Sequence, residues 1–250
     1  MKNHTFVICA YKESPYLEES ILSLKNQTVK SNIIMATSTP NEWIQSLAEK
    51  YEIPLYINTG DSGIAQDWNF AYRQAKTDYV TIAHQDDTYE PDYLKMVMKG
   101  LKKAKDPIIA FTDYGELRDG QKVRKSTLLT IKRILLLPIR ARAFQNVKFF
   151  KRFSLRFGNP VCCPATTYVR DKFEGDPFEV RFSSNVDWMM LEKQSRKEGS
   201  FCYIPMTGMY HRIHEKSTTT EIISAGERTT KCFESSGRHG LQNHWSGFIV

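Results

Sequence analysis

The alternation of strand-like and helix-like segments across the first 115 residues most constrains what this chain can fold into. Short apolar runs lie at residues 4–11, 32–37, 54–58, 78–83 and 107–114, and amphipathic segments lie between them at 14–27, 40–51, 63–76 and 91–104. Parallel strands need a crossover of about a dozen residues, usually a helix. The spacing therefore predicts an α/β fold with a mostly parallel central sheet and helices on both of its faces.

The size and composition of the chain fit one compact domain. It has 250 residues, of which 41% are hydrophobic, enough for one sizeable core. No apolar run is long enough to span a membrane as a helix, and the N-terminus lacks the long apolar segment of a signal peptide. The five cysteines form no CxxC pair, which favours reduced thiols. We therefore expect a cytoplasmic protein.

The net charge of +7 comes from one segment of the chain. Residues 121–170 hold twelve Lys and Arg and no Asp or Glu, whereas the other 23 basic residues are outnumbered by 28 acidic ones. Residues 122–157 interleave apolar and basic side chains at helical spacing, with a break at Pro138. This pattern predicts a basic helical insertion that lies against an anionic membrane surface. The alternative is a solvated insertion that packs its apolar side on the core.

Nucleic acid is not expected as the anionic partner of this segment. Its aromatic residues are phenylalanines, and they do not occur in the sequence of a known nucleic-acid-binding module. Because the expected anionic partner is a membrane surface, we predict that the protein lies peripherally at the inner face of the membrane.

Two adjacent acids, Asp86 and Asp87, follow the apolar run 78–83 directly. Neighbouring carboxylates repel each other, so without screening by water they need a cation or a raised pKa. Ligands of α/β proteins bind at the carboxyl ends of the strands, which is where this pair is expected. The alternative is a polar turn in which Asp87 or Thr88 caps the next helix.

The usual phosphate-binding loops are missing. Neither GxGxxG nor GxxxxGK[ST] follows the first apolar run, so a nucleotide must be held in another way.

Several motifs, in order along the chain, resemble those of the family 2 glycosyltransferases of the GT-A fold. The matching residues are Ala10, Tyr11 and Lys12 after the first apolar run; Leu24, Asn26, Gln27 and Thr28 at the end of the first helical segment; and Asn58, Gly60, Gly63, Asn69, Ala75 and Thr77 further on. The resemblance extends from about Thr5 to Ser217. It implies a Rossmann-like GT-A fold and an inverting transfer of a sugar from a nucleotide-diphosphate sugar, with UDP expected.

The resemblance also implies roles for individual residues. Ala10 and Tyr11 would contact the base, Asp86 the ribose or a metal, and Asp87 a divalent cation, Mn²⁺ or Mg²⁺, that bridges the diphosphate. The same comparison assigns to the nucleotide site Glu13, Thr37 and Asn69. The chemistry agrees, because the leaving nucleoside diphosphate gains negative charge that a hard cation held by carboxylates stabilises.

An inverting transfer also needs a base that deprotonates the acceptor hydroxyl. Asp187 opens an amphipathic helical segment and resembles the acid of the family at this place. The alternative is that Asn185 or Asp187 only caps this helix. Glu192 is a weaker candidate for the base.

A later motif, Arg212, His214 and Ser217, resembles the Arg-x-His-x-x-Ser ending of the family. It implies that His214 completes the metal site and that Arg212 binds the diphosphate. His211 is the less favoured histidine.

The chain departs from the family pattern in two places. Thr37 and Ser38 stand where many members have an Asp pair that reads the base, and His84 stands where many have a further Asp. These departures leave the identity of the base and the number of metal ligands open.

We interpret the chain as a single GT-A domain in three parts: a nucleotide-sugar-binding half (1–115), an acceptor-binding half with the basic insertion (116–217), and a C-terminal tail (218–250) that could close as a lid. The expected acceptor is a lipid-linked glycan or a polysaccharide of the cell surface. The alternatives are a sugar-nucleotide nucleotidyltransferase and a non-catalytic lobe that recruits a partner transferase.

Overall fold

A computed structural model describes residues 3–182 and 184–214 of the chain. All nine elements expected in the first 115 residues are present. The strands are β1 (His4–Ala10), β2 (Asn32–Thr37), β3 (Leu55–Ile57), β4 (Tyr79–His84), β5 (Thr88–Tyr89), β6 (Pro107–Arg118), β7 (Gln121–Val123), β8 (Thr166–Val169) and β9 (Ser200–Ile213). The α-helices are α1 (Leu17–Lys25), α2 (Glu42–Lys50), α3 (Ile64–Gln74), α4 (Tyr93–Lys103), α5 (Thr127–Leu135), α6 (Lys148–Leu155) and α7 (Val186–Ser195). Short 3₁₀ helices are η1 (Leu137–Ile139), η2 (Arg142–Phe144), η3 (Cys163–Ala165) and η4 (Arg170–Lys172).

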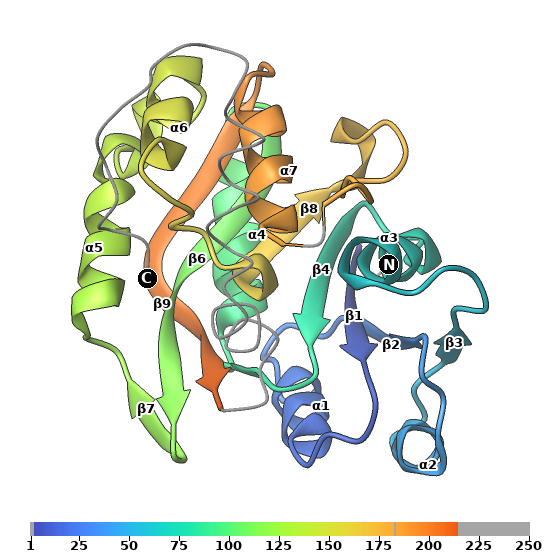
Figure 1. The fold of residues 1–250 in the computed structure, drawn as a ribbon. Helices are drawn as coiled ribbons and strands as arrows, with labels where there is room; N and C mark the ends of the chain where they lie inside the picture. The colour runs from blue at the N-terminus through green and yellow to red at the C-terminus, as the bar shows by residue number, and fades with distance from the viewer. Residues whose placement is uncertain (1–2, 183, 215–250) are drawn as a thin grey trace. The chain divides into compact units, whose positions relative to one another are not determined.

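The strands form one sheet in the order β3-β2-β1-β4-β8-β6-β9-β5, with β7 paired to β6 (Figure 1). Strands β1 to β4 are parallel, as the alternation predicts. Strand β8 is antiparallel to both β4 and β6, so β6 runs in the direction of β4 without touching it. The expected α/β fold is confirmed, and the sheet becomes mixed in the half of the chain where the strand–helix alternation ends.

The helices cover both faces of the sheet because side chains alternate along each strand. Phe6 and Ile8 of β1 pack on the face covered by α1, α2 and α4. Val7 packs on the other face with α3, α6 and α7. The carboxyl ends of β1 and β4 emerge between these two layers.

The loop after β4 is held in place by Gln27, a motif residue that is almost completely buried. Its amide nitrogen donates to the carbonyl of Glu90 at 2.8 Å, and its amide oxygen accepts from the backbone nitrogen of Leu94 at 3.0 Å. These bonds join the end of α1 to the start of α4. They fix the C-terminal end of the segment that carries the acid pair.

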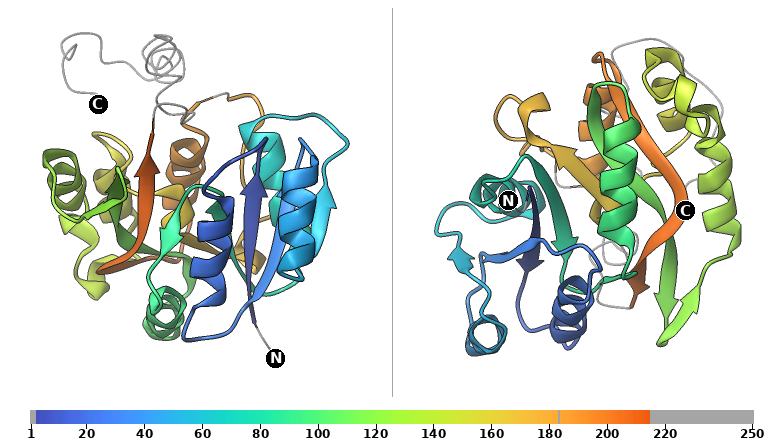
Figure 2. Two further views of the ribbon diagram at one scale, coloured as in Figure 1. Left: turned by 90° about the horizontal axis from the view of Figure 1, so that it is seen from below. Right: turned by 180° about the vertical axis from the view of Figure 1, so that it is seen from behind.

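The basic segment folds as α5, the turns η1 and η2, and α6, with the expected break at Pro138 inside η1. Ser126 caps α5 by accepting a hydrogen bond from the backbone nitrogen of Leu129 at 3.2 Å. Figure 2 shows these helices at the end of the sheet opposite to β3.

The chain divides into a unit that ends at Arg212 and a second unit that begins at Ile213. The expected tail, residues 218–250, lies outside the described residues, as does Ser217. Among residues 3–182 and 184–214, no helix has the length and apolar character needed to cross a membrane.

Candidate active site

The acid pair lies in the turn between β4 and β5, at the carboxyl end of β4. Helix α4 begins only at Tyr93, and the residue before it is Asp92. Asp86 and Asp87 therefore do not cap this helix, and neither does Thr88, which belongs to β5. The capping alternative is wrong for this pair.

Asp87 is completely buried and lies among basic groups. Its Oδ1 accepts hydrogen bonds from the backbone nitrogen of Arg212 and from Nδ1 of His211, both at 2.9 Å. Its Oδ2 is buried without a hydrogen-bond partner among the described residues, and Nδ1 of His84 lies 3.8 Å away. Burial alone would raise the pKa of Asp87, but the attraction of His211 and these hydrogen bonds outweigh it, so the pKa is lowered. Asp87 is therefore a buried anion.

Asp86 is the more accessible carboxylate of the pair, being half-buried. Its Oδ1 accepts from the hydroxyl of Ser14 at 2.6 Å, and its backbone carbonyl accepts from Nε of Arg212 at 2.9 Å. The backbone of the acid pair is thus fixed while the Asp86 carboxylate lies at the edge of the site.

Arg212 is buried and binds the protein itself. Its guanidinium pairs with Glu19 of α1, donates to the carbonyl of Asp86, and lies 4.1 Å from the centre of the Tyr16 ring. We expected this side chain to bind the diphosphate. These contacts hold the acid-pair turn against α1, and the diphosphate role of Arg212 stays a prediction.

The two histidines of the later motif are placed differently. His211 lies on β9, and its hydrogen bond to Asp87 joins β9 to the acid pair. Burial would lower the pKa of His211, but the Asp87 carboxylate outweighs it, so the pKa is raised. His214 follows the end of β9 and belongs to the second unit. The sequence alone does not distinguish the two, and the metal role of His214 stays a prediction.

Tyr11 is half-exposed directly after β1, so its ring can stack on a base. Its backbone nitrogen and oxygen each form a 2.9 Å hydrogen bond with the side-chain amide of Gln85, which joins the ends of β1 and β4. Ala10 is buried at the end of β1, and Glu13 is exposed in the loop that follows. The expected nucleotide residues of this loop thus lie beside the acid pair.

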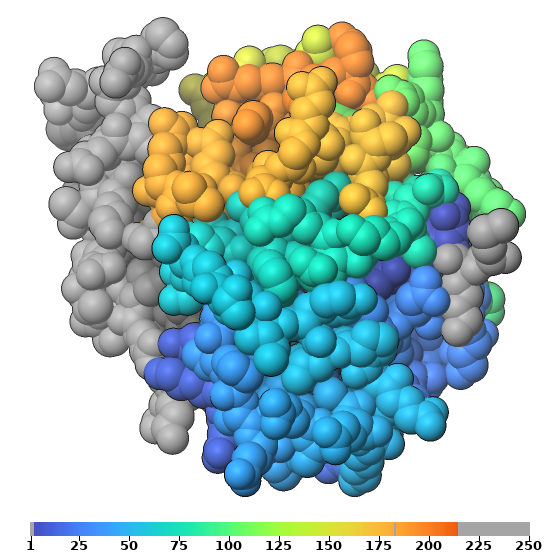
Figure 3. Space-filling view, turned by 90° about the vertical axis from the view of Figure 1, so that its right-hand side faces the viewer, coloured from blue at the N-terminus to red at the C-terminus, as the bar shows by residue number. Residues whose placement is uncertain are grey.

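Two other expected nucleotide residues are buried and bind the protein. Both ends of the Asn69 amide bond the backbone of Phe178, at 2.7 and 3.0 Å, so Asn69 holds the segment around Phe178 against α3. Figure 3 shows these two segments (cyan and amber) against each other. The hydroxyl of Thr37 accepts from the backbone nitrogen of Thr39 at 3.0 Å. These contacts give Asn69 and Thr37 partners within the chain, and their nucleotide-binding roles stay predictions.

Asp187 lies in the first turn of α7, half-buried. Its Oδ2 accepts from the side-chain amide of Asn159 at 2.7 Å, and its Oδ1 accepts from the backbone nitrogen of Trp188 at 2.9 Å. Asn185 precedes the helix in the left-handed conformation, and its side chain makes no capping hydrogen bond. Burial raises the pKa of Asp187 against these hydrogen bonds, which suits a carboxylate that accepts a proton.

His84 shows that these acids share one site. Its pKa is lowered by burial first, and the charges of Asp87, His211, Asp86 and Asp187 all act on it as well. The ring of Trp68 stacks on the imidazole with 5.1 Å between ring centres. His84 and His211 thus both lie against Asp87, and the charge of Asp187 acts on the same imidazole.

Comparison with known protein families identifies the family of the chain. Residues 5–175 match the model of glycosyl transferase family 2. The chain belongs to this family. A search of curated proteins finds no match.

Solved glycosyltransferase structures share the fold of this family 2 chain. S. aureus TarS 1–349 in complex with UDP-GlcNAc is 14% identical, with a TM-score of 0.61 over 86% of this chain and 60% of that one. The mannosyltransferase PcManGT from Pyrobaculum calidifontis, in complex with GDP-Man and Mn²⁺, is 14% identical, with a TM-score of 0.69 over 96% of this chain and 66% of that one. The chain thus spans about 60% of the length of the TarS 1–349 structure. These likenesses confirm the GT-A fold.

The donor set of this family 2 site fits a metal that arrives with its substrate. Among the described residues, no group of three or more His, Cys, Asp or Glu is arranged to hold a metal ion. Two carboxylates are at hand, Asp86 at the edge and Asp87 with a buried oxygen that has no hydrogen-bond partner there. Mg²⁺ commonly binds one or two carboxylates and completes its coordination with substrate phosphates and water. The acid pair fits a metal held in this way.

Sequence reasoning missed three side chains of the site. Asp67, at the start of α3, accepts from Ser38 and Asn58, both at 2.9 Å, so it places a carboxylate beside the position where the family's base-reading acids are absent. Asn159 donates a hydrogen bond to Asp187. The charge of Lys132 of α5 opposes the rise in the pKa values of Asp187 and His211. No motif marks these residues, since only the fold brings them near the acids.

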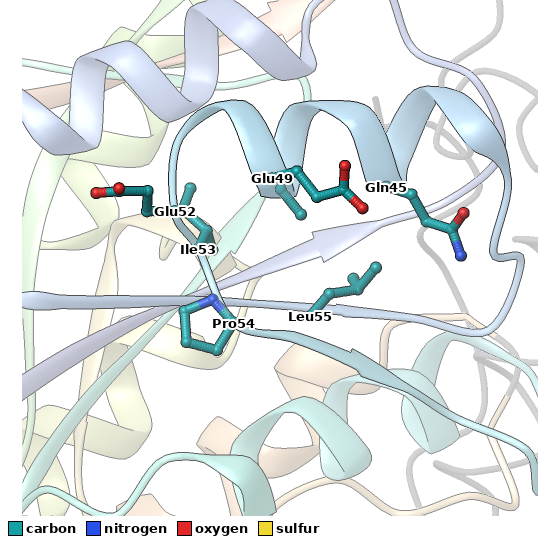
Figure 4. Close-up of a pocket in the computed structure, with 7 residues that line it drawn as sticks. Gln45, Glu49, Glu52, Ile53, Pro54 and Leu55 are labelled. Carbon is teal, nitrogen blue, oxygen red and sulfur yellow. The ribbon is translucent and has the colours of Figure 1, made fainter.

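A hollow of about 510 Å³ lies away from this site, between α2 and β3. Figure 4 shows Gln45 and Glu49 of α2 above Leu55 of β3. Its lining contains none of the acids around His84, so the family 2 site is not located there.

Proposed function

We propose that this chain is an inverting glycosyltransferase that moves a sugar from a nucleotide-diphosphate sugar to a glycan or lipid-linked acceptor. The observation that carries the proposal is the acid pair Asp86 and Asp87 at the carboxyl end of β4, held by His211 and Arg212 in a family 2 chain. A pair of acids suits a metal-bound diphosphate, and a separate acid with a raised pKa suits the base.

The donor would lie over the carboxyl ends of β1 and β4, with its base against the Tyr11 ring and its diphosphate near Asp86. A UDP-sugar is the proposed donor. One neighbour in fold is complexed with UDP-GlcNAc and another with GDP-Man, so both classes belong in the test. Asp67, held by Ser38 and Asn58, is the carboxylate best placed to take part in choosing the base.

Asp86 and Asp87 would hold a divalent cation, Mn²⁺ or Mg²⁺. When bound, this cation neutralises the charge that develops on the leaving diphosphate. His211 and the backbone of Arg212 orient Asp87 through its Oδ1, which leaves Oδ2 for the cation.

Asp187 would take the proton from the acceptor hydroxyl as the oxygen attacks the anomeric carbon. The bond from that carbon to the diphosphate oxygen breaks on the opposite side, so the configuration inverts. Asn159 orients the carboxylate through Oδ2, and the raised pKa gives it the basicity for the step.

The proposal is tested by incubating the chain with UDP- and GDP-sugars and Mn²⁺ or Mg²⁺, without acceptor, and measuring the nucleoside diphosphate released. We expect slow metal-dependent release from at least one donor, and loss of it with EDTA or in Asp86→Ala. A matched control is Asp176→Ala, which removes an acid that pairs with Arg73 on the surface. If no donor is bound or hydrolysed, the chain is a binding lobe and the proposal fails.

A further inference from the structure

We infer that residues 131–157 form a face that docks on an anionic membrane, called here the interfacial face. The structure exposes large apolar side chains at seventeen described positions, and eight of them fall within these 27 residues. They are Ile131, Ile134, Leu137, Phe144, Val147, Phe149, Phe153 and Phe157. Such a concentration marks an interaction surface, since single exposed apolar residues are otherwise scattered.

Helix α6 packs Leu155 and Phe150 against the core but also turns a row of phenylalanines toward solvent. Phe149, Phe153 and Phe157 are spaced four residues apart and are 67%, 43% and 66% exposed. Their rings form one stripe, with 6.0 Å between the centres of each neighbouring pair. The buried side also holds Lys151, whose ammonium donates to the carbonyls of Lys197 and Gly199, both at 2.7 Å. The exposure of the stripe is thus fixed by contacts on the other side of the helix.

Cations surround this apolar stripe. The exposed basic residues of the segment include Arg140, Arg142, Lys148, Arg152 and Arg156, and no acid occurs between residues 121 and 170. Lys148 pairs with Glu198, and the neighbouring arginines add to the positive charge. Phenylalanines that insert between acyl chains and cations that meet anionic head groups are the two contacts of an interfacial helix.

The same charges argue against a second copy of the chain as the occupant. In a twofold dimer each face meets itself, so this face would bring its arginines against the partner's arginines. The like charges would repel, whereas an anionic lipid surface complements them.

The interfacial face is connected directly to the proposed base. Phe157 precedes Asn159 by two residues, a span of about 7 Å at most, and Asn159 donates to Asp187. The indole nitrogen of Trp188 donates to the carbonyl of Leu155 at 3.3 Å, so the end of α6 is also joined to the start of α7. Docking therefore brings Asp187 close to the lipid surface. This favours an acceptor whose sugar is carried on a membrane lipid, a consequence that rests on the proposed function.

Docking is tested with the full chain and sedimented vesicles, without donor or acceptor, so its failure is separate from failure of the transferase proposal. We expect binding to phosphatidylcholine vesicles that contain phosphatidylglycerol, little binding to pure phosphatidylcholine, and weakening by salt. Replacing Phe149 and Phe153 by Ser should weaken binding by roughly tenfold or more, because two inserted rings are lost. Replacing Arg152 and Arg156 by Glu should do the same.

Two matched controls use exposed residues outside the face. Val180→Ser with Met206→Ser removes apolar surface, and Lys102→Glu with Lys103→Glu makes the same change of charge on α4. Both should retain binding to within about twofold, apart from the general effect of net charge that salt removes. Circular dichroism checks that every variant is folded.

Three results would overturn the inference. They are equal binding to neutral and anionic vesicles, equal loss in the control variants, and retained binding in both face variants. Self-association that Phe149→Ser with Phe153→Ser abolishes, in the absence of vesicle binding, would show that the face binds protein instead.

Discussion

Helices α4 and α6 are both amphipathic and basic, but only α6 also turns large apolar side chains toward solvent. Helix α4 buries Tyr93, Leu94 and Val97 against the sheet, under the acid pair. Helix α6 exposes Phe149 and Phe153 and buries Lys151 with Leu155. The comparison teaches that helical periodicity predicts a two-sided helix without saying which side faces the core. Neither helix contains an acid, so the feature that separates the two is the length of the acid-free stretch around α6, residues 121–170, whereas Asp92 and Asp106 flank α4.

The largest expected effect is the difference in the free energy of unfolding between a substitution in α4 and one in α6. Leu94→Ala should lower the free energy of unfolding by about 3 kcal/mol, because it removes buried apolar volume. Phe149→Ala should change it by no more than about 0.5 kcal/mol, because the ring is mostly exposed. Urea unfolding followed by circular dichroism measures both. A loss in Phe149→Ala as large as that in Leu94→Ala would mean that α6 packs its phenylalanines into the protein.

Substitutions in the two regions should also affect different properties, the rate of transfer in one and the affinity for the donor in the other. Asp187→Asn should slow transfer by roughly 100-fold or more, because the amide cannot accept the acceptor's proton. Donor affinity should be unchanged, since the donor is expected on the side of Tyr11 and Asp86. Glu192→Gln, on the same helix, is the control and should transfer nearly normally. Normal transfer by Asp187→Asn would show that another residue is the base.

The pH profile sharpens this assignment. Asp187 acts as a base only when ionised, and burial raises its pKa. Transfer should therefore fall, as the pH is lowered, at a higher pH than an ordinary aspartate would give. If the rate of transfer instead fell at the pH expected for an exposed aspartate, the assignment of a buried base would be contradicted.

Lys151 should stabilise the packing of α6. Lys151→Met leaves the carbonyls of Lys197 and Gly199 without their donor, so the free energy of unfolding should fall by about 2 kcal/mol. Burial lowers the pKa of Lys151 to about 8. The unfolded chain then binds more protons than the folded one from about pH 8 up to the ordinary lysine pKa of about 10.4, so this group adds stability as pH rises through that window.

Urea unfolding of wild type and Lys151→Met at pH 7 and pH 9.5, values chosen on either side of about 8, separates the two effects. The free energy of unfolding of the wild type, relative to that of the variant, should be larger at pH 9.5 than at pH 7. An equal difference at both pH values would mean that Lys151 titrates normally.

The smallest effect is expected at Tyr11, whose exposed ring lies near the acid pair. Tyr11→Ala should weaken binding of UDP by about 1 kcal/mol, or roughly fivefold, through lost stacking on the base. Its maximal rate should change little. Calorimetry with UDP and Mn²⁺ measures the change, and Tyr56→Ala, an exposed tyrosine of β3, is the control. Equal losses in both variants would remove Tyr11 from the nucleotide site.

The first half of the fold is predictable because its pattern is local. Each parallel strand from β1 to β4 is followed by its own crossover helix or turn, and the apolar spacing records this. Strands β8 and β9 join the sheet beside strands that are distant in sequence, so no local spacing announces their direction. The antiparallel pairing of β8 with β4 and β6 was therefore not predicted.

The site shows the same limit. Asp86, Asp87 and Asp187 could be named because motifs surround them. The partners of Arg212 and Asn69 could not be, since Glu19 lies 193 positions from Arg212 and Phe178 lies 109 positions from Asn69. A motif marks such residues without showing whether they face a ligand or another part of the chain.

The acid pair should bind Mn²⁺ tightly only together with a nucleoside diphosphate, because the protein offers two carboxylates and no cluster of three ligands among its described residues. Free Mn²⁺ can be measured by electron paramagnetic resonance while the full chain is titrated in, with and without UDP or GDP. We predict weak binding by the protein alone, much tighter binding with the diphosphate present, and loss of that gain in Asp86→Ala. Tight Mn²⁺ binding without nucleotide, or diphosphate binding that is equal with and without Mn²⁺, would contradict the assignment of this pair.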